Sequence, residues 1–171
     1  MSAPRSTNAA ERSRTTSWAD PLATAAAGRK LDGLGFLRAV MKGDIPPPPI
    51  ASTIGMSLVD VGEGLAVFTM DSGEHQYNPI GMVHGGVVST LLDSAMGCAV
   101  QSLLPQGKAF TTLELKVNFV RPVGLASGTL RCEGRVLHNG SRVATAEGKV
   151  LDSAGKLCAH ATTTCMIMDV G

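Results

Sequence analysis

The sequence predicts an α+β fold in which an antiparallel sheet wraps around one long central helix. The stretch from Gly85 to about Leu104 carries apolar residues on every side and only one charged residue, Asp93, which is the pattern of a helix buried on most sides. Two strand-like segments precede this stretch and four longer ones follow it, and runs of strands around a single helix are typical of α+β domains. One side of the helix would remain uncovered by its own sheet, so we expect a dimer.

The composition argues against several classes of protein. A chain of 171 residues with a net charge of +1 and 4% aromatic residues suits one domain and lacks the basic surface of a nucleic-acid-binding protein. The predicted helix holds too many Ser, Thr and Gln residues to span a membrane. We recognise no secretory leader and no cysteine pair with metal-ligand spacing, so we expect a cytoplasmic protein with reduced thiols at Cys98, Cys132, Cys158 and Cys165.

The N-terminal part of the chain is expected to add little to the fold. Its first thirty residues are rich in Arg, Ser, Thr and Ala without apolar periodicity, which predicts a disordered tail dispensable for catalysis or, alternatively, an organelle transit peptide. A short helix is predicted over Asp32–Lys42 with Asp32 as its N-cap, and the prolines at 46–49 predict an extended segment. The expected division is a tail (1–30), a short helix and Pro-rich linker (31–51) and one domain (52–169).

Six segments of the remaining chain have the patterns of strands. In the third, apolar residues from Leu113 to Phe119 alternate with Glu114, Lys116 and Asn118, which predicts an antiparallel strand with one buried face. The Asn139-Gly140 pair predicts a tight hairpin between the fourth and the fifth. The predicted strands lie at residues 54–61, 65–71, 113–119, 130–136, 142–151 and 156–168.

Motifs before the helix, at its start and in its middle, and in and after the strand that follows it, resemble a known enzyme family. The sequence reads Asn78-Pro79-x4-His84-Gly85-Gly86-x6-Asp93, then Thr111-Thr112-Leu113, then Asn118-Phe119-x-Arg121-Pro122-Val123. Over about residues 52–168 this pattern resembles the phenylacetate-type (PaaI-like) branch of the hotdog-fold acyl-CoA thioesterases. The resemblance implies a hotdog fold and hydrolysis of aryl- or medium-chain acyl-CoA to free acid and coenzyme A. It also implies no metal or other cofactor, and a homodimer that assembles as a dimer of dimers.

The resemblance assigns roles to five residues of this sequence. Asn78 and His84 would orient the site, and Gly85 would supply the oxyanion donor. Asp93 would act as the general base or as the nucleophile, and the two roles stay open. Thr112 stands where relatives have a Ser or Thr that helps to place the attacking water.

The residues themselves support this chemistry. Gly85 and Gly86 at a helix N-terminus would offer unpaired backbone N–H groups at the positive end of the helix dipole, and each oxyanion donor is worth about 2.7–4 kcal/mol. Two alternatives remain open at this stage. The glycines could serve helix–sheet packing alone, and Asp93 could be a structural carboxylate bonded to Ser89 or Thr90.

The pattern of its strand gives Thr112 an alternative to its predicted place in the site. Simple alternation places Thr112 on the polar face of its strand with Glu114 and Lys116, away from the apolar face. A β-bulge, or a position at a dimer interface, would bring it to the site. Otherwise Thr112 is an ordinary sheet residue.

Cationic and polar residues beyond the motif are candidates for the coenzyme A end of the substrate. An arginine can bind phosphate through two parallel hydrogen bonds. The candidates are Gly86, Arg121, Ser141 and Arg142. A metal site built from His75, His84 and Asp93 would need spacings that no usual motif supplies.

Two classes of function fit these observations. The first is an acyl-CoA thioesterase, and the second is a non-catalytic acyl-CoA-binding regulator on the same fold. Asp93 favours the enzyme, because a binding protein has no evident need for a carboxylate in a buried helix.

Overall fold

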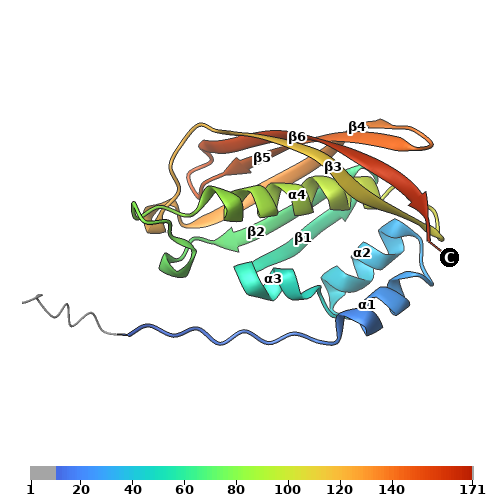
Figure 1. Cartoon of the computed structure of the whole chain (residues 1–171), viewed down its shortest axis with the longest axis horizontal. Helices are drawn as coiled ribbons and strands as arrows, with labels where there is room; N and C mark the ends of the chain where they lie inside the picture. The colour runs from blue at the N-terminus through green and yellow to red at the C-terminus, as the bar shows by residue number, and fades with distance from the viewer. Residues whose placement is uncertain (1–10, 171) are drawn as a thin grey trace, which may run out of the picture.

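A computed structural model describes residues 11–170 and shows a six-stranded antiparallel sheet curved around one long helix (Figure 1). The sheet order is β1-β2-β4-β5-β6-β3. The predicted α+β fold, with the sheet wrapped around the helix, is confirmed. The strands are β1 (Met56–Gly62), β2 (Leu65–Asp71), β3 (Lys108–Phe119), β4 (Thr129–Asn139), β5 (Val143–Leu151) and β6 (Leu157–Asp169).

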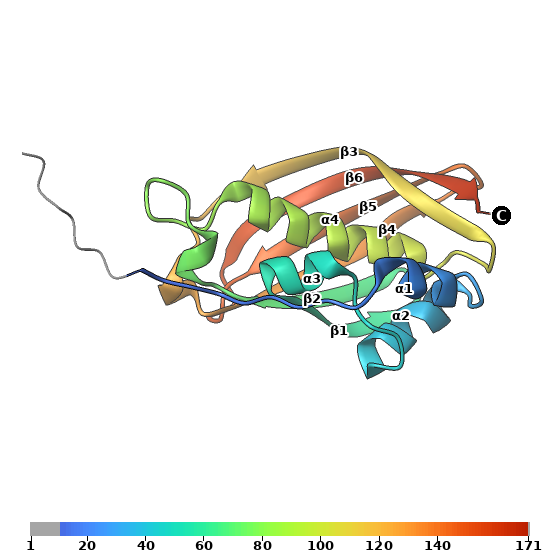
Figure 2. The ribbon, with the colours of Figure 1, turned by 60° about the horizontal axis from the view of Figure 1, so that its bottom comes forward.

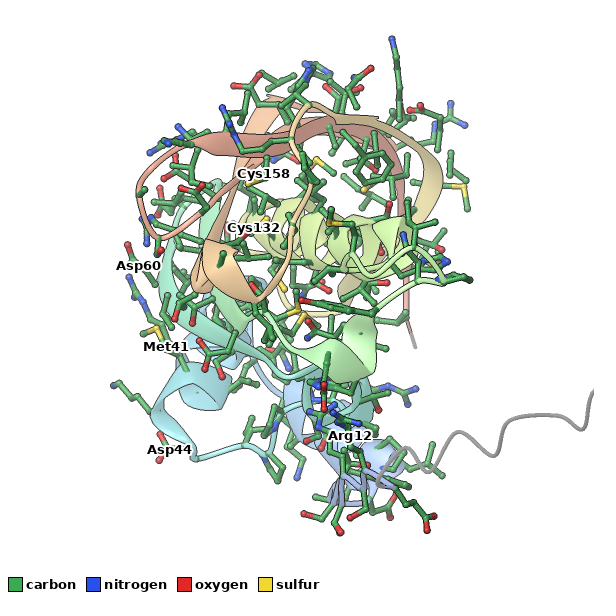
Figure 3. All side chains as sticks on the ribbon, turned by 90° about the vertical axis from the view of Figure 1, so that its left-hand side faces the viewer. Arg12, Met41, Asp44, Asp60, Cys132 and Cys158 are labelled. Atoms are coloured by element: carbon green, nitrogen blue, oxygen red, sulfur yellow. The ribbon has the colours of Figure 1, made fainter. Side chains whose placement is uncertain are left out.

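The long helix, α4 (Gly85–Gln101), supplies most of the core. Leu91, Leu92 and Met96 on it are fully shielded from solvent. The sheet approaches α4 closely at Gly134, where a Cβ atom would lie 2.4 Å from the backbone of Ala95. On the same strand Cys132 donates a hydrogen bond from Sγ to the carbonyl oxygen of Leu91 at 3.6 Å (Figure 3).

The helix is shorter than predicted at its C-terminal end. We expected it to reach about Leu104, and it ends at Gln101. The N–H groups of Leu103 and Leu104 instead bond three residues back, to Val100 and Gln101. Pro105 follows directly, and the residue before a proline is disfavoured in the α conformation.

Three short helices precede the sheet: α1 (Pro21–Gly28), α2 (Gly33–Lys42) and α3 (Pro49–Ile54). The predicted short helix is α2. Asp32 caps it as expected, because its carboxylate accepts a hydrogen bond from the N–H of Gly35 at 2.6 Å. Gly43 ends it in the left-handed conformation with φ +84°.

The other two helices differ from the prediction. α1 lies inside the segment that the sequence marked as a disordered tail; the Asp20 carboxylate caps it through the N–H of Leu22 at 2.9 Å, and Pro21 suits its first turn. α3 begins at the last of four prolines and includes Ile54, which we had placed in the first strand. Residues 1–10 of the predicted tail lie outside the described residues.

Hydrogen bonds to the domain hold the segment before α1. The Arg14 guanidinium donates to the carbonyl oxygens of Thr53 at 2.7 Å and Ser52 at 3.0 Å, and Arg12 forms an ion pair with Glu74. Figure 2 shows this segment passing alongside α3 before it enters α1. The described part of the predicted tail is therefore packed on the domain.

The sheet ends at β1 on one side and at β3 on the other. Among residues 11–170, β3 pairs only with β6, so one row of its backbone N–H and C=O groups has no strand partner. Leu113 and Phe119 on β3 are 57% and 55% exposed. Of the helices in the same residues, none is long and apolar enough to cross a membrane.

Candidate active site

Asp93 and Thr112, predicted as parts of one site, are in direct contact. The hydroxyl of Thr112 on β3 donates a hydrogen bond from Oγ1 to Oδ1 of Asp93 in the middle of α4, at 2.9 Å. Both side chains are half-buried. Hydrogen bonds to a charged group are stronger than neutral ones, so this contact holds the carboxylate in one position.

A β-bulge explains how Thr112 reaches the helix. Thr112 pairs with Cys165 and Glu114 pairs with Thr164, so Leu113 is the extra residue on β3. Simple alternation placed Leu113 on the buried face and Thr112 with Glu114 on the other. Simple alternation is wrong for these two residues, and the β-bulge that the sequence left open as the alternative is confirmed. The bulge shifts the alternation by one residue, so that Leu113 is 57% exposed and Thr112 faces α4.

The alternative partners of Asp93 bond elsewhere. Ser89 and Thr90 donate from their hydroxyls to the carbonyl oxygens of Gly85 and Gly86, each at 2.9 Å. Their hydrogen bonds are satisfied within the first turns of α4. Asp93 is therefore not held as a structural carboxylate by the preceding turn.

The helix N-terminus has one free donor in place of the predicted pair. His84 is the N-cap, and its Nδ1 accepts a hydrogen bond from the N–H of Gly86 at 2.8 Å. Within the described residues the N–H of Gly85 has no hydrogen-bond partner. Gly86 therefore does not offer its N–H to a substrate in this structure, which corrects the prediction for that residue. Gly85 keeps the geometry of an oxyanion donor.

The same bond fixes the tautomer of His84. An Nδ1 that accepts a hydrogen bond carries no proton, so the neutral ring bears its proton on Nε2. The Nε2–H group is then a donor on an exposed side chain. His84 can orient a neighbouring group, as predicted, and its cap also stabilises the first turn of α4.

Gly85 and Asn78 border a small cavity of about 230 Å³ that also touches Arg121. A Cβ atom at Gly85 would lie 3.1 Å from Cζ of Phe119, so a side chain there would crowd the ring. Asn78 organises the loop before α4, because its Oδ1 accepts hydrogen bonds from the N–H groups of Ile80 and Met82 at 3.1 Å each.

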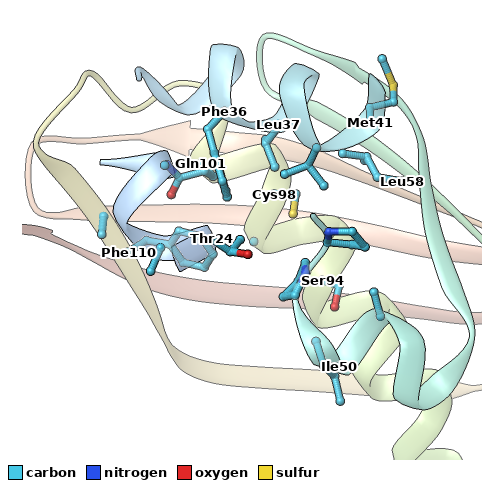
Figure 4. A pocket seen from close by; sticks show the side chains of 18 of the residues that line it. Thr24, Phe36, Leu37, Met41, Ile50, Leu58, Ser94, Cys98, Gln101 and Phe110 are labelled. Atoms are coloured by element: carbon cyan, nitrogen blue, oxygen red, sulfur yellow. The ribbon is translucent and has the colours of Figure 1, made fainter. Parts of the chain in front are cut away.

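Asp93 borders a different and larger cavity of about 720 Å³. Its walls come from α4, the start of β3, β1 and all three N-terminal helices (Figure 4). These N-terminal residues were not among the predicted site residues. The available signal was the cluster of apolar side chains in the short helix, namely Phe36, Leu37, Val40 and Met41.

The predicted site residues therefore fall into two groups within one chain. Gly85 and Asp93 are eight residues apart on α4, which is about 12 Å along a helix axis, and they border separate cavities. One chain does not bring the oxyanion donor and the carboxylate together.

The candidates for coenzyme A contacts divide in the same way. Arg121 borders the cavity of Gly85, and its Nε donates to the carbonyl oxygen of Leu157 at 3.4 Å. Ser141 and Arg142 are exposed at the turn before β5. Val143 at the start of β5 and Thr111 on β3 both pair with Met166 of β6, so the start of β5 lies in line with Thr111. Thr111 and Phe119 are about 27 Å apart along an extended strand. The two arginines thus lie at opposite ends of the sheet.

The Cys98 thiol, which lies close to Asp93, does not act as a nucleophile at neutral pH. Cys98 borders the larger cavity one turn further along α4. Burial and then the negative charge of Asp93 raise the pKa of its thiol to about 12, so the thiolate that a nucleophilic cysteine requires is not formed at neutral pH. Across residues 11–170, no three His, Cys, Asp or Glu side chains gather in a way that could hold a metal ion.

Comparison with known proteins supports the fold and the family. Residues 80–159 match the model of the Thioesterase superfamily. The Halobacterium salinarum protein VNG_1336C is 35% identical over 118 residues, which cover 66% of this chain and 76% of the relative. Acyl-coenzyme A thioesterase PaaI of Escherichia coli is 29% identical over 109 residues, or 64% and 75% of the two chains.

Solved structures extend the likeness beyond the matched segment. A phenylacetic acid degradation-related protein from Ralstonia eutropha JMP134 superimposes with a TM-score of 0.70 at 31% identity, covering 76% of this chain and 98% of that one. The sheet around its central helix, together with these relatives, identifies a hotdog-fold thioester hydrolase. The chain belongs to the thioesterase superfamily and is of the PaaI-like type.

Proposed function

We propose that this enzyme hydrolyses acyl-CoA thioesters to the free acid and coenzyme A, without a metal ion or another cofactor. The observation that carries the proposal is the Thr112–Asp93 hydrogen bond of 2.9 Å at the border of a cavity of about 720 Å³. It positions a carboxylate beside a space large enough for an acyl group. The similarity to a protein named acyl-coenzyme A thioesterase supports coenzyme A as the thiol.

The catalytic unit in this proposal is a homodimer. A reacting carbonyl must lie about 3 Å from its oxyanion donor and close to the base or nucleophile, which Gly85 and Asp93 of one α4 do not satisfy. Two α4 helices related by a two-fold axis place Gly85 of one copy opposite Asp93 of the other. The free edge of β3, with its exposed Leu113 and Phe119, gives the second copy a strand to pair with. We propose that such dimers pair again into a tetramer.

The chemical steps use three groups of the protein and a water molecule. The N–H of Gly85 binds the thioester oxygen and stabilises the negative charge that develops on it. Asp93 of the second copy takes a proton from water, whose oxygen attacks the carbonyl carbon. Alternatively, the Asp93 carboxylate attacks the carbonyl carbon itself, and water hydrolyses the resulting anhydride. In both routes the carbon–sulfur bond breaks, the thiolate leaves and is protonated to coenzyme A. The hydroxyl of Thr112 stays hydrogen-bonded to Oδ1 of Asp93, which leaves the other carboxylate oxygen to face the substrate.

The arginines fit the same dimer. Arg121 lies beside the Gly85 of its own chain, whereas Arg142 lies at the end of the sheet that carries Thr112. A two-fold axis that joins Gly85 to the second Asp93 therefore brings Arg121 of one copy and Arg142 of the other toward one site. We propose that they bind the phosphates of coenzyme A, with Ser141 beside Arg142 as a further donor.

The proposed compartment is the cytoplasm. All four cysteines lie within the described part of the chain and are free thiols, which fits a reducing environment.

The test is a panel of acetyl-, hexanoyl-, dodecanoyl- and phenylacetyl-CoA incubated with the full-length protein, EDTA and a thiol-reactive dye. We expect thiol release that is unaffected by EDTA. Absence of release from every member, with measurable acyl-CoA binding, would favour the non-catalytic regulator. Release that EDTA abolishes would contradict the metal-free mechanism.

A further inference from the structure

The cavity beside Asp93 has a wall that the superfamily match does not include. The matched residues are 80–159, whereas all of α1, α2 and α3 precede them. These helices contribute Thr24 and Ala25 from α1, Leu37 and Met41 from α2 and Ile50 from α3. Figure 4 shows Leu37 of α2 and Cys98 of α4 pointing into the same space.

The cavity is long in the direction that leads away from Asp93. The residues of α4 that border it run from Asp93 through Gly97 to Gln101, which is about 12 Å along the helix. At Gly97 a Cβ atom would lie 2.6 Å from Cζ of Phe110, so the Phe110 ring packs directly on the helix at this point. An acetyl or phenylacetyl group whose thioester lies at Asp93 would leave the far part of this space unfilled.

The cavity is lined mostly by apolar residues, and its charged side chains lie toward its two ends. Besides Asp93, its charged neighbours are Arg29 and Lys108. Lys108 forms an ion pair with Asp169 at 2.7 Å, and the carbonyl oxygen of Arg29 accepts a hydrogen bond from Gln106 at 3.3 Å. Both residues therefore lie near the C-terminal end of α4, opposite the Asp93 end. The Cys98 thiol between the two ends is neutral, as its raised pKa of about 12 indicates.

We infer that α1, α2 and α3 form the acyl pocket of this enzyme and that the pocket takes medium- to long-chain aliphatic acyl groups. This inference rests on the proposed acyl-CoA hydrolysis. An extended chain whose thioester lies at Asp93 runs along α4 from Ser94 past Cys98 toward Gln101. Its methylene groups contact apolar side chains of the N-terminal helices. Apart from its thioester, an aliphatic acyl chain has no polar group, so it needs no hydrogen-bond donor or acceptor from the cavity wall.

The first experiment compares substrates with the full-length protein. We expect kcat/KM to rise from acetyl- through hexanoyl- to dodecanoyl-CoA, by up to about fourfold for each methylene that enters the pocket, and phenylacetyl-CoA to be slower than dodecanoyl-CoA. If acetyl- or phenylacetyl-CoA is the best substrate, the inference fails while the proposed function stands. If no member is hydrolysed, the proposed function itself fails.

The second experiment narrows the pocket from α1. Ala25 borders the cavity, and its neighbour Ala26, on the same helix, is exposed and does not border the cavity. We expect Ala25→Trp to lower the ratio of kcat/KM for dodecanoyl-CoA to that for hexanoyl-CoA at least about tenfold, since two displaced methylenes give this factor. Ala26→Trp should keep the wild-type ratio. Equal ratios in the two variants would overturn the inference.

A binding measurement keeps the test independent of turnover. A ligand that binds the folded state alone raises the melting temperature. Free dodecanoate should raise it in the wild type and in Ala26→Trp, and raise it less in Ala25→Trp or in Ile50→Trp, which fills the cavity from α3. Acetate at the same concentration should have no effect. A shift of equal size in all four proteins would contradict binding between α4 and the N-terminal helices.

Discussion

Thr112 donates its hydroxyl hydrogen bond to Oδ1 of Asp93 at 2.9 Å, although the two residues lie on different elements and a regular strand would point Thr112 the other way. The bulge at Leu113 creates this contact. Bulges are common beside active sites, where they redirect a side chain. The contact links the sheet to the one carboxylate on α4.

Replacing Asp93 with Asn should nearly abolish turnover and leave substrate binding measurable. The amide keeps the shape of the carboxylate and loses its basicity and its nucleophilicity. A general base contributes about 100- to 10,000-fold, so we expect kcat to fall within that range. Steady-state kinetics with dodecanoyl-CoA and equilibrium binding of the same compound would measure the two effects. An Asp93→Asn enzyme with most of its activity would remove Asp93 from the mechanism.

Replacing Thr112 with Val should lower kcat about tenfold or more, with a smaller change in KM. A hydrogen bond to a charged group is worth about 1.5–3 kcal/mol, and every 1.4 kcal/mol corresponds to a factor of ten. Thr112→Ser keeps the hydroxyl and should recover most of the rate. The matched control is Thr111→Val, because Thr111 is exposed on the same strand. Equal losses in the two valine variants would show that the strand, and not the hydroxyl, is responsible.

His84→Ala should destabilise the protein and reduce kcat less than Asp93→Asn does. The variant loses the N-cap bond to Gly86, and losing an N-cap costs about 0.5–2 kcal/mol. His84→Asn can still accept that hydrogen bond, so its melting temperature should lie close to the wild-type value. If His84→Ala is as inactive as Asp93→Asn while remaining folded, then His84 takes part in the chemistry directly.

Glu133, on the outer part of the sheet, should make stability depend on acid pH. The hydrogen bond from Arg135 is the main cause that lowers the pKa of its carboxyl from the ordinary value of 4.5, and the charges of Lys149, Arg135 and Arg131 add to it, while burial opposes them. A carboxyl with a lowered folded-state pKa stabilises the fold above its unfolded pKa, and this stabilisation is lost as pH falls through the folded value.

The matching experiment is chemical denaturation between pH 7 and pH 2 for the wild type and Glu133→Gln. The wild type should lose more unfolding free energy than the variant as the pH falls below about 4.5, the ordinary pKa of a Glu carboxyl. Parallel curves for the two proteins would show that the ion pairs around Glu133 contribute nothing measurable.

The strongest sequence patterns predicted the central elements correctly. The apolar stretch from Gly85 gave the start of α4, and Leu65–Asp71 matches β2 in full. These elements follow local rules, because burial on all sides and strict alternation are visible within a short window. The Asp93 side chain was predictable for the same reason, since a lone charge in such a helix requires a partner.

The elements that were missed depend on contacts between distant residues. α1 follows an extended segment that Arg14 attaches to Ser52 and Thr53, nearly forty residues away. Its Ala- and Thr-rich sequence resembles a disordered tail until that attachment is known. The bulge on β3 is likewise invisible in a pattern of alternating residues, and the cap on Gly86 depends on the orientation of the His84 ring. We therefore no longer expect residues 21–30 to be dispensable, because several of them border the acyl pocket.

The last prediction is that neither chain of the dimer carries a complete site. Two inactive variants provide the test: Asp93→Asn, which lacks the carboxylate, and Gly85→Pro, which lacks the oxyanion N–H. Proline is well tolerated in the first turn of a helix, although its ring would approach Phe119. Each variant must therefore first be shown by circular dichroism and sedimentation to fold and to form dimers.

Mixed dimers with one copy of each variant are then isolated through two different affinity tags. In a shared site, one of the two sites combines the intact Gly85 of one copy with the intact Asp93 of the other, and the second site has neither. Such dimers should recover up to about half of the wild-type rate, by the counting that two-fold symmetry imposes. If the site were contained in a single chain, every site in the mixed dimer would lack one group, and the mixture would stay as inactive as its parents. Since Gly85 and Asp93 border separate cavities of one chain, we expect recovery.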